Sequence, residues 1–328
     1  MVYRICGTGL TRSFPAGPSF YDPLMLQGYD ERNADIVYWV NGTLRHRDEP
    51  GISPFDSAVQ GGDAVWEGLR LYQGAIFGLD AHLARLRRSA TALNFAAIPT
   101  DAEITEAIVA TLRANRMVDG VHIRLTLTRG VKITSGMDPR LNRAGATLIV
   151  LAEHKAPVYD TTGLRLITAS VRRPGPDVLD PKIHHANLLN SILAKIEATV
   201  AGADDALMLD GRGFVAETNA THLFAVFGGA LVTPSTAACP EGITRQTVLE
   251  LAATAAIPAV VRDVSLAEMY AADEVFCTGT MGEIAGVTMI DGRPIGGGRT
   301  GALTERIARL YQQHARAHGV RLIAPDGP

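Results

Sequence analysis

The sequence predicts an α/β (α+β) fold built from two globular domains. The chain has 328 residues, which is more than a single hydrophobic core usually serves. Predicted strands occur in both halves of the chain, and one of them, in the first half, alternates strictly between apolar and polar residues. Segments with apolar residues at helical spacing lie between them, and 47% of all residues are hydrophobic, enough to fill two cores.

The first half of the chain contains two predicted hairpins and one strongly patterned strand. The run IVYWVNGTL turns at Asn41-Gly42, and LRLYQGAIFG turns at Gln73-Gly74, because such pairs favour two-residue hairpin turns. The run VHIRLTLT, residues 121–128, alternates strictly between apolar and polar side chains. We therefore expect one face of this strand in a core and the other on a polar surface.

Helices are predicted from periodic apolar residues and capping side chains. In the first half, one helix is expected over residues 80–94, and Asp101 is expected to cap the next. In the second half, Asn187 is a plausible cap for a helix that ends at Val200 and whose stripe we expect to be buried. Two further helices are predicted over 243–256 and 303–317.

These elements indicate a domain organisation. Residues 1–35 are rich in Gly, Pro, Ser and Tyr without periodicity, which suggests an irregular N-terminal arm. Residues 36–155 form a predicted small α/β domain, residues 156–163 a linker, and residues 164–328 a larger α/β domain.

Composition excludes several classes of function. The net charge is −3 and no long Lys/Arg run is present, which argues against nucleic acid or an anionic membrane as partner. Cys6, Cys239 and Cys277 are widely spaced and odd in number, so a disulfide framework or zinc site is not expected. His184-His185 lack a third ligand at sensible spacing, and we predict no metal site. Without a signal peptide or an apolar span, the chain is expected in the cytoplasm.

Lys182 and Glu217 are the two most suggestive single residues. Lys182 lies on a predicted loop before a helix, where partial desolvation would favour its amine as a nucleophile. Judged from the local sequence alone, a surface lysine beside a Pro turn is the favoured interpretation, because most lysines are solvated. Glu217 lies near the end of a strand, where a carboxylate could pair with a protonated ring nitrogen, or could be an ordinary turn residue.

Three segments could bind a phosphate group. Ile243 and Thr244 open a helix after Gly242, and the free N–H groups of a helix start attract anions. Thr280 lies in TGTMG directly after a strand, where glycines can form a nest of N–H donors. Arg85 shares a helix with two other arginines and could reach a phosphate bidentately, although most of that charge is expected in solvent.

Taken together and in order, these segments resemble the class IV aminotransferases, the fold-type IV pyridoxal-phosphate enzymes. The resemblance covers about residues 35 to 315 and is carried by AVWEGLRLY, HLARLRRSA, IRLTLTRG, PK…NLLNSILAKIEA, GFVAETNATHLF, EGITRQTVLELA and ADEVFCTGTMGEIAGV. Branched-chain amino-acid aminotransferases look closest. The resemblance implies two domains with the cofactor pyridoxal 5′-phosphate in the cleft between them, and a homodimer or higher homo-oligomer.

The resemblance also implies residue roles. Lys182 takes the place of the catalytic lysine that forms a Schiff base with the cofactor, and Glu217 that of the carboxylate at the pyridine nitrogen. The implied cofactor-binding set is Arg85, Lys182, Glu217, Ile243, Thr244, Gly279, Thr280 and, as partner of the phenolate oxygen, Arg173. The implied substrate-binding set is Trp66, His122, Arg124, Ala220, Thr280 and Met281.

Several positions depart from the family pattern. Leu188 stands where branched-chain members usually have a tyrosine, which is why Arg173 is the substitute partner of the phenolate oxygen. The spacing from Lys182 to Asn187 is one residue longer than usual, so the intervening loop is expected to bulge. The other departures lie around the substrate: Gly61 and His122 replace tyrosines, and Thr218-Asn219-Ala220 replaces a glycine pair.

The implied reaction is transfer of an amino group between an amino acid and a 2-oxo acid such as 2-oxoglutarate. L-branched-chain or other hydrophobic amino acids are the favoured donors, because Trp66 suggests an apolar pocket. The segments TRG and NLL also fit a D-amino-acid or (R)-amine transaminase, and 4-amino-4-deoxychorismate lyase shares the fold and the lysine. A binding protein without catalysis is the remaining alternative.

Overall fold

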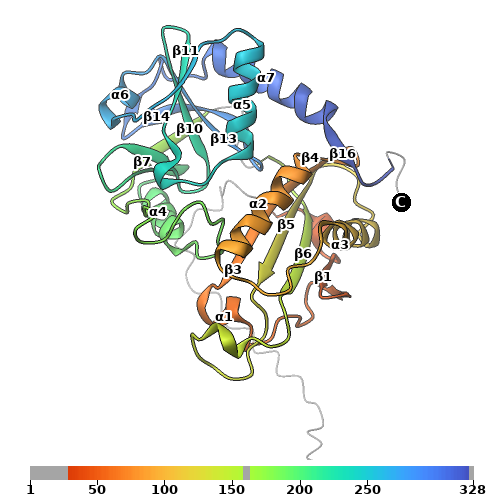
Figure 1. Cartoon of the computed structure of the whole chain (residues 1–328). Coiled ribbons are helices and arrows are strands. Elements are labelled where there is room, and N and C mark those ends of the chain that lie inside the picture. The colour runs from red at the N-terminus through yellow and green to blue at the C-terminus, as the bar shows by residue number, and fades with distance from the viewer. Residues whose placement is uncertain (1–28, 158–162, 325–328) are drawn as a thin grey trace, which may run out of the picture.

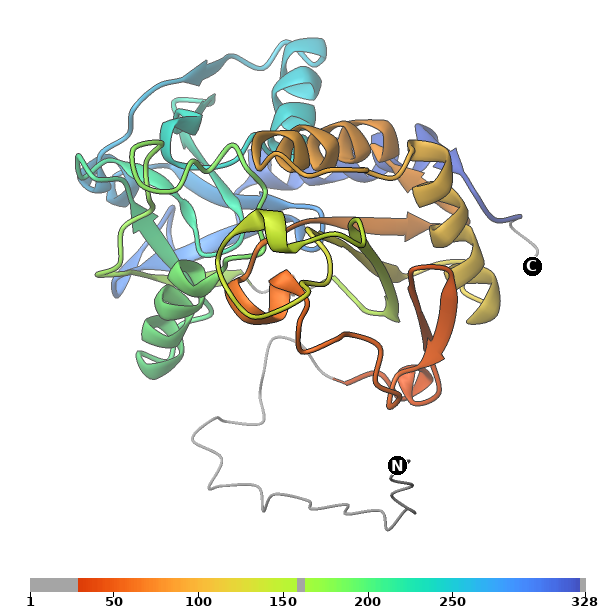
Figure 2. The same cartoon turned by 60° about the horizontal axis from the view of Figure 1, so that its bottom comes forward.

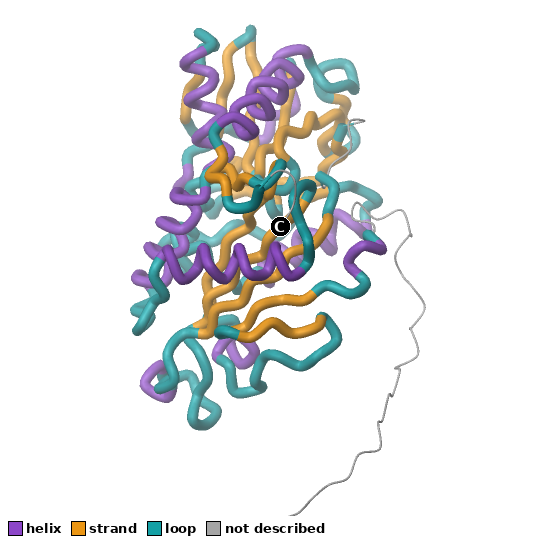
Figure 3. The backbone as a smooth tube through the Cα atoms, turned by 90° about the vertical axis from the view of Figure 1, so that its right-hand side faces the viewer, coloured by secondary structure: helices purple, strands orange, loops and turns teal. Residues whose placement is uncertain are grey.

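The protein folds into two lobes, each built around its own β-sheet (Figure 1). The structure is a computed structural model that describes residues 29–157 and 163–324. Most of the predicted N-terminal arm, and most of the predicted linker, therefore lie outside the described residues. Strands run through both lobes and helices pack around them (Figure 3). None of the described helices is long and apolar enough to cross a membrane.

The first lobe contains a seven-stranded sheet. Its strands are, in spatial order, β16 (Gly319–Arg321), β4 (Ala75–Phe77), β3 (Ala64–Tyr72), β5 (Val121–Thr128), β6 (Thr147–His154), β1 (Val37–Val40) and β2 (Thr43–His46). Every pairing in it is antiparallel. The chain thus returns its last strand to the sheet formed by its first half, although residues 164–328 were predicted to form the other domain.

Both predicted hairpins are confirmed. Asn41 and Gly42 have φ of 42° and 89°, and Gln73 and Gly74 have φ of 47° and 81°, which is the geometry of a two-residue hairpin turn. Gly74 is also required by packing, because a Cβ there would lie 2.2 Å from the backbone oxygen of Ile323. This contact fixes the C-terminal segment against the second hairpin.

Two helices cover one face of this sheet (Figure 2). The helix α2 (Leu79–Ala92) packs on β3, and α3 (Asp101–Ala114) packs on β6 and β1. The N-cap of α3 is Thr100, with Glu103 completing a capping box, so the prediction of Asp101 as the cap was wrong by one residue. Between helices and sheet lies a dry core, which includes Leu69, Leu71, Leu86, Ile104, Ile108, Ile123 and Leu125.

The second lobe contains a nine-stranded, mixed sheet. Its path is β12 (Ala259–Val261), β11 (Ala230–Thr233), β10 (His222–Phe227), β13 (Glu274–Gly279), β14 (Glu283–Ile290), β7 (Leu164–Thr168), β8 (Asp205–Leu209) and β9 (Val215–Thr218), with β15 (Arg293–Pro294) paired to β14. The helices α5 (Ile243–Thr254) and α7 (Ala302–Ala317) pack on β13 and on each other. The helix α7 also contacts β4, which joins the two lobes.

The helix α4 (Leu189–Val200) differs from its prediction in two ways. Its N-cap is Leu188, without a side-chain hydrogen bond, and not Asn187. Its predicted buried stripe is exposed: Ile192 is 51% and Ile196 is 44% exposed, whereas the buried residues of the helix are alanines. Periodicity located the helix but could not tell which small side chains pack on β8.

The remaining elements are short. They are α1 (Ser57–Gly61), α6 (Leu266–Tyr270) and the 3-10 turns η1 (Glu31–Asn33), η2 (Pro139–Leu141) and η3 (Thr236–Ala238).

Candidate active site

A buried ion-pair cluster between β3 and α2 forms one side of the site. The guanidinium of Arg85 donates from Nε and Nη2 to the two carboxylate oxygens of Glu67, at 2.8 and 2.7 Å, and His82 Nδ1 lies 2.6 Å from the same carboxylate. Although burial alone would raise it, the hydrogen bonds from Arg85 and His82 lower the pKa of Glu67 to about 2. Glu67 is fully buried. The sequence did not identify Glu67 as the partner of Arg85, because this pairing depends on how β3 and α2 pack together.

Arg85 also links the two lobes. Its Nη1 donates to the backbone oxygen of Glu241 at 2.7 Å, just before α5 begins. The predicted phosphate residues meet at this junction: Ile243, Thr244 and Thr280 line one narrow pocket between the lobes. Arg85 therefore lies beside the predicted cup, but much of its hydrogen-bonding capacity is taken by Glu67.

The start of α5 offers unsatisfied N–H donors. Gly242 is its N-cap and makes no side-chain cap hydrogen bond. A Cβ at Gly242 would lie 2.5 Å from Cε1 of His222, so only glycine allows β10 to approach the helix start this closely. Nearby, the Thr278 hydroxyl is buried without a hydrogen-bond partner, and Gly279 ends β13 directly before Thr280. Buried donors without partners fit a bound oxyanion.

Glu217 lies in the interior of the second lobe, on β9. It is 4% exposed, and its Oε1 forms an ion pair with Nη2 of Arg173. Burial raises the pKa of Glu217 to about 7, even though Arg173 and Arg85 act to lower it. Arg173 was predicted to contact the cofactor's phenolate oxygen; the structure pairs it with Glu217 and, through Nη1, with Ser191 Oγ at 2.9 Å.

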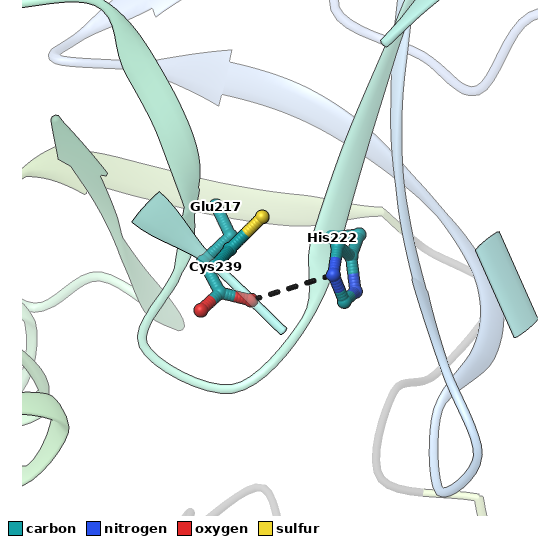
Figure 4. A group of neighbouring side chains, drawn as sticks. All are labelled: Glu217, His222 and Cys239. Atoms are coloured by element: carbon teal, nitrogen blue, oxygen red, sulfur yellow. Dashed lines mark ion pairs between the residues drawn. The ribbon is translucent and has the colours of Figure 1, made fainter. Parts of the chain in front are cut away.

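Glu217, His222 and Cys239 group closely enough to suggest a metal site (Figure 4). His222 Nε2 is 3.8 Å from the Glu217 carboxylate, but it donates to the Pro240 backbone oxygen at 2.8 Å and is not free to ligate. Burial raises the pKa of the Cys239 thiol well above its usual range, which disfavours the thiolate that a metal needs. Because Arg173 is already paired with Glu217, this donor set does not fit a metal ion.

Lys182 lies at the rim of this region, in a turn. Its Nζ donates to Thr236 Oγ1 at 2.7 Å and is 3.7 Å from the Glu241 carboxylate, and its side chain is 40% exposed. The chain has only four lysines. Two of the others are engaged elsewhere: Lys132 donates to the Gly136 backbone oxygen and Lys195 to Asp205. The fourth, Lys155, follows β6 in the first lobe, and its charge acts on His122. Lys182 lies near Glu241, whose backbone oxygen accepts from Arg85.

The segment after Lys182 pairs with the free edge of β3. Trp66 N donates to the His184 backbone oxygen at 3.0 Å, and Ala186 N donates to that of Ala64 at 2.7 Å. The additional residue of this loop is thus accommodated by a short strand-like contact. As a result, His184 lies beside Trp66 and Glu67. The sequence did not indicate that His184 would be close to these residues.

The predicted substrate residues Trp66, His122 and Arg124 share the polar face of the first sheet. The guanidinium of Arg124 stacks on the Trp66 ring at 3.6 Å from its centre and makes no hydrogen bond or ion pair with any described residue. Burial lowers the pKa of Arg124 to about 10. Both ring nitrogens of His122 are buried and have no hydrogen-bond partner among residues 29–157 and 163–324. Burial together with Lys155 lowers the pKa of this ring to about 3.

Two other predicted substrate residues contribute less distinctive geometry. Ala220 is exposed on the turn between β9 and β10, where its N–H donates to Thr218 Oγ1 at 3.2 Å. Met281 is half-buried, directly after Thr280. The structure thus brings the cup residues together and stacks Arg124 on Trp66, while Ala220 lies at an exposed turn.

Comparison with known proteins decides the family. Residues 64–290 match the model of amino-transferase class IV. The chain belongs to this family. It is 38% identical to a putative branched-chain-amino-acid aminotransferase of Methanocaldococcus jannaschii, over 87% of this chain and 98% of that protein. The resemblance predicted from the sequence, and the fold type it implied, are confirmed.

Two further class IV relatives define the similarity. Branched-chain-amino-acid aminotransferase-like protein 2 of Arabidopsis thaliana is 53% identical over 88% of this chain, but the match covers 52% of that protein, so the chain spans about half the length of this relative. The crystal structure of the T.th. branched-chain amino acid aminotransferase complexed with N-(5′-phosphopyridoxyl)-L-glutamate aligns with a TM-score of 0.81, at 34% identity, over 87% of this chain and 95% of that one.

Proposed function

We propose that this protein is a pyridoxal-phosphate-dependent aminotransferase. It would move an amino group from an L-branched-chain or other hydrophobic amino acid to a 2-oxo acid such as 2-oxoglutarate. The observation that carries this proposal is that the buried carboxylate of Glu217 lies 3.8 Å from His222, whose ring packs directly against Gly242 at the N–H-rich start of α5. The solved relative that contains a phosphopyridoxyl group supports the same cofactor.

The residues present fit the cofactor. Its phosphate dianion would take the N–H groups of Ile243 and Thr244 and the hydroxyl of Thr280, in the positive potential of Arg85. The Thr278 hydroxyl, which is buried without a partner, is a further donor at this junction. Glu217 would hold the proton of the pyridine nitrogen. When bound, the cofactor supplies the electron sink that acidifies the substrate's α-carbon.

The chain's own groups have separate tasks in this proposal. The Lys182 amine would attach the cofactor and, once released by substrate, would carry a proton to and from the α-carbon. To do so, the Lys182 amine must give up its hydrogen bond to Thr236 and turn toward the cofactor. Because its side chain is 40% exposed, it has room for this movement. Arg124, which lacks a carboxylate partner, would bind a carboxylate of the substrate against Trp66.

Spectra and turnover test this function. The purified protein should show the visible band of bound pyridoxal phosphate and should transfer the amino group of leucine to 2-oxoglutarate. No turnover of leucine would sink the branched-chain assignment; turnover of D-alanine or an (R)-amine, or release of pyruvate from 4-amino-4-deoxychorismate, would replace it. Lys182→Arg should reduce turnover by about 10²- to 10⁴-fold, whereas Lys195→Arg, which keeps the charge beside Asp205, should not.

We also propose that the protein is a homodimer that uses α4. Its exposed apolar residues recur at helical spacing, namely Leu189, Ile192, Leu193, Ile196 and Val200. The stripe is uncharged and therefore compatible with a second copy of itself about a two-fold axis. Ile192→Glu should shift the molar mass measured by light scattering from dimer to monomer, whereas Glu197→Gln should not. A wild-type monomer would contradict the proposal.

A cytoplasmic location is the compartment we favour. The thiols of Cys239 and Cys277 are both free and buried, which suits a reducing environment. Fractionation of cells that express the protein at its natural level would test this.

A further inference from the structure

His184 occupies a central position that none of the roles above uses. Its ring stacks on Trp66 with 4.5 Å between ring centres, and its Nδ1 lies 3.6 Å from the Glu67 carboxylate. Its backbone N–H donates to Ser89 Oγ at 3.0 Å, on α2. His184 thus lies between Trp66, which is predicted to contact the substrate, and the Glu67–Arg85 ion pair.

The hydrogen bonds of His184 define its tautomer. Nδ1 lies within hydrogen-bonding distance of the Trp66 backbone oxygen, and because a carbonyl oxygen can only accept, Nδ1 must carry the hydrogen. Burial, with Arg85 nearby, lowers the pKa of the ring to about 4, so it is neutral near pH 7. The lone pair is therefore on Nε2. This atom has no hydrogen-bond partner among the described residues, and the His184 side chain is 16% exposed.

The surroundings indicate which ligand group needs this lone pair. The nearby cations Arg85 and Arg124 can donate only, and suit phosphate and carboxylate. The two buried carboxylates described at the site already have partners, Glu67 in Arg85 and His82, and Glu217 in Arg173. The amino group of an amino-acid substrate must donate, and it requires an acceptor that does not become charged in the working pH range.

We propose that His184 is a substrate-positioning residue whose Nε2 accepts a hydrogen bond from the amino group of the incoming amino acid. The Nδ1–H contact with Trp66 holds the ring in place and fixes the acceptor. This role rests on the proposed function, because it assigns a partner to the amine that the reaction transfers. A 2-oxo acid lacks that amino group. His184 should therefore contribute to binding of the amino acid and not to binding of the 2-oxo acid.

Substitution can remove the Nε2 acceptor of His184 while keeping the hydrogen bond to the Trp66 backbone oxygen. In His184→Asn the side-chain amide can still donate to the Trp66 carbonyl, but the Nε2 acceptor is lost. The holoenzyme should then show an apparent KM for leucine raised by about 10- to 150-fold, the effect of one hydrogen bond to a charged group. The KM for the 2-oxo acid should stay within about threefold of its wild-type value. His46→Asn, at a half-buried position on β2 in the first lobe, is the matched control.

A second measurement does not depend on turnover. In 15N NMR spectra of the imidazoles, His184 should show a protonated Nδ1 and a bare Nε2, and the Nε2 signal should shift when leucine is added but not when its 2-oxo acid is added. His184→Phe keeps a ring that can stack on Trp66 but lacks Nε2. Its KM for leucine should rise as in His184→Asn, and agreement of the two variants would exclude misfolding of one of them as the cause.

The outcomes distinguish the two proposals. Equal effects of His184→Asn on both substrates, or a protonated Nε2, would overturn the role of His184 while a normal cofactor spectrum left the aminotransferase proposal intact. A wild-type protein that binds no pyridoxal phosphate would overturn the aminotransferase proposal and this role with it.

Discussion

The two sides of the candidate site differ in how their charges are partnered. Beside α2, the Glu67 carboxylate is matched by Arg85 and His82, all buried. On the polar face of the first sheet, Arg124 stacks on the Trp66 ring and is attracted by Glu67, but it makes no hydrogen bond or ion pair with any described residue. His122 has no hydrogen-bond partner among the described residues. Removing one member of a fully paired buried cluster leaves the other charges uncompensated and costs stability, whereas a buried polar group without a partner is a candidate to bind a ligand. The first side is therefore scaffold and the second is recognition surface.

Breaking the paired side should have the largest effect on stability. Glu67→Gln leaves Arg85 and His82 buried without a carboxylate, which should lower the free energy of unfolding by about 3–5 kcal/mol. Urea denaturation followed by circular dichroism measures it, with Glu106→Gln on the surface of α3 as control. A loss below about 1 kcal/mol would show that the cluster does not support the fold.

Removing a charge from the unpaired side should affect binding and leave the fold unchanged. Arg124→Met keeps apolar contact with Trp66 but removes the guanidinium. We expect the KM for amino-acid substrate to rise by about 10- to 150-fold, the loss of a charge-assisted hydrogen bond. The free energy of unfolding should change by less than about 1 kcal/mol, because no protein carboxylate loses its partner. A stability loss as large as that of Glu67→Gln would remove the distinction between the two sides.

Acidification should destabilise the protein through histidines that are buried in neutral form. Burial lowers the folded-state pKa of His122 and His222 to about 3 and that of His184 to about 4, below the ordinary value of 6.5. Between pH 6.5 and 4 the unfolded chain therefore binds protons that the folded chain does not. Stability is fully present above pH 6.5 and falls below it, by about 1.4 kcal/mol per pH unit for each histidine.

Chemical denaturation at pH 7.5, 6.5, 5.5 and 4.5 would measure this dependence. His122→Gln should reduce the slope by up to one proton, whereas the exposed His318→Gln should leave the slope unchanged. A flat profile would mean that these rings take up protons in the folded state as readily as in the unfolded chain.

A contact outside both sides should have the smallest effect. Thr100 caps α3 through its hydroxyl, which accepts from the Glu103 N–H at 3.2 Å. Thr100→Ala should cost about 1 kcal/mol of unfolding free energy and leave KM unchanged. Asp101→Asn, one residue further, keeps the cap and should cost less. A KM change in Thr100→Ala would show that α3 is coupled to the site.

Local pattern was sufficient for several of the elements. Both hairpin turns and the alternating strand β5 were predicted because their signals lie within a few residues. Ile243, Thr244 and Thr280 were predicted as one cup from the family order of their motifs, and they line one pocket. The sequence is informative where a few neighbouring residues are enough to determine the local backbone geometry.

Features that depend on distant contacts were not predictable. The pairing of Glu67 with Arg85 joins a strand to a helix, and neither residue signals it locally. The exposure of Ile192 and Ile196 reverses the expected burial, because alanines on the other face of α4 pack on β8. His184 gains its neighbours only when its segment pairs with the edge of β3.

The most direct test of the central claim is to find where the cofactor is attached. The holoenzyme is reduced with borohydride and digested, and the phosphopyridoxyl group is located by peptide mass spectrometry among the four lysines, Lys132, Lys155, Lys182 and Lys195. We predict a single modified site at Lys182. Cofactor bound tightly without modification of any lysine, or attached at Lys155, would contradict the assignment of Lys182 as the catalytic lysine.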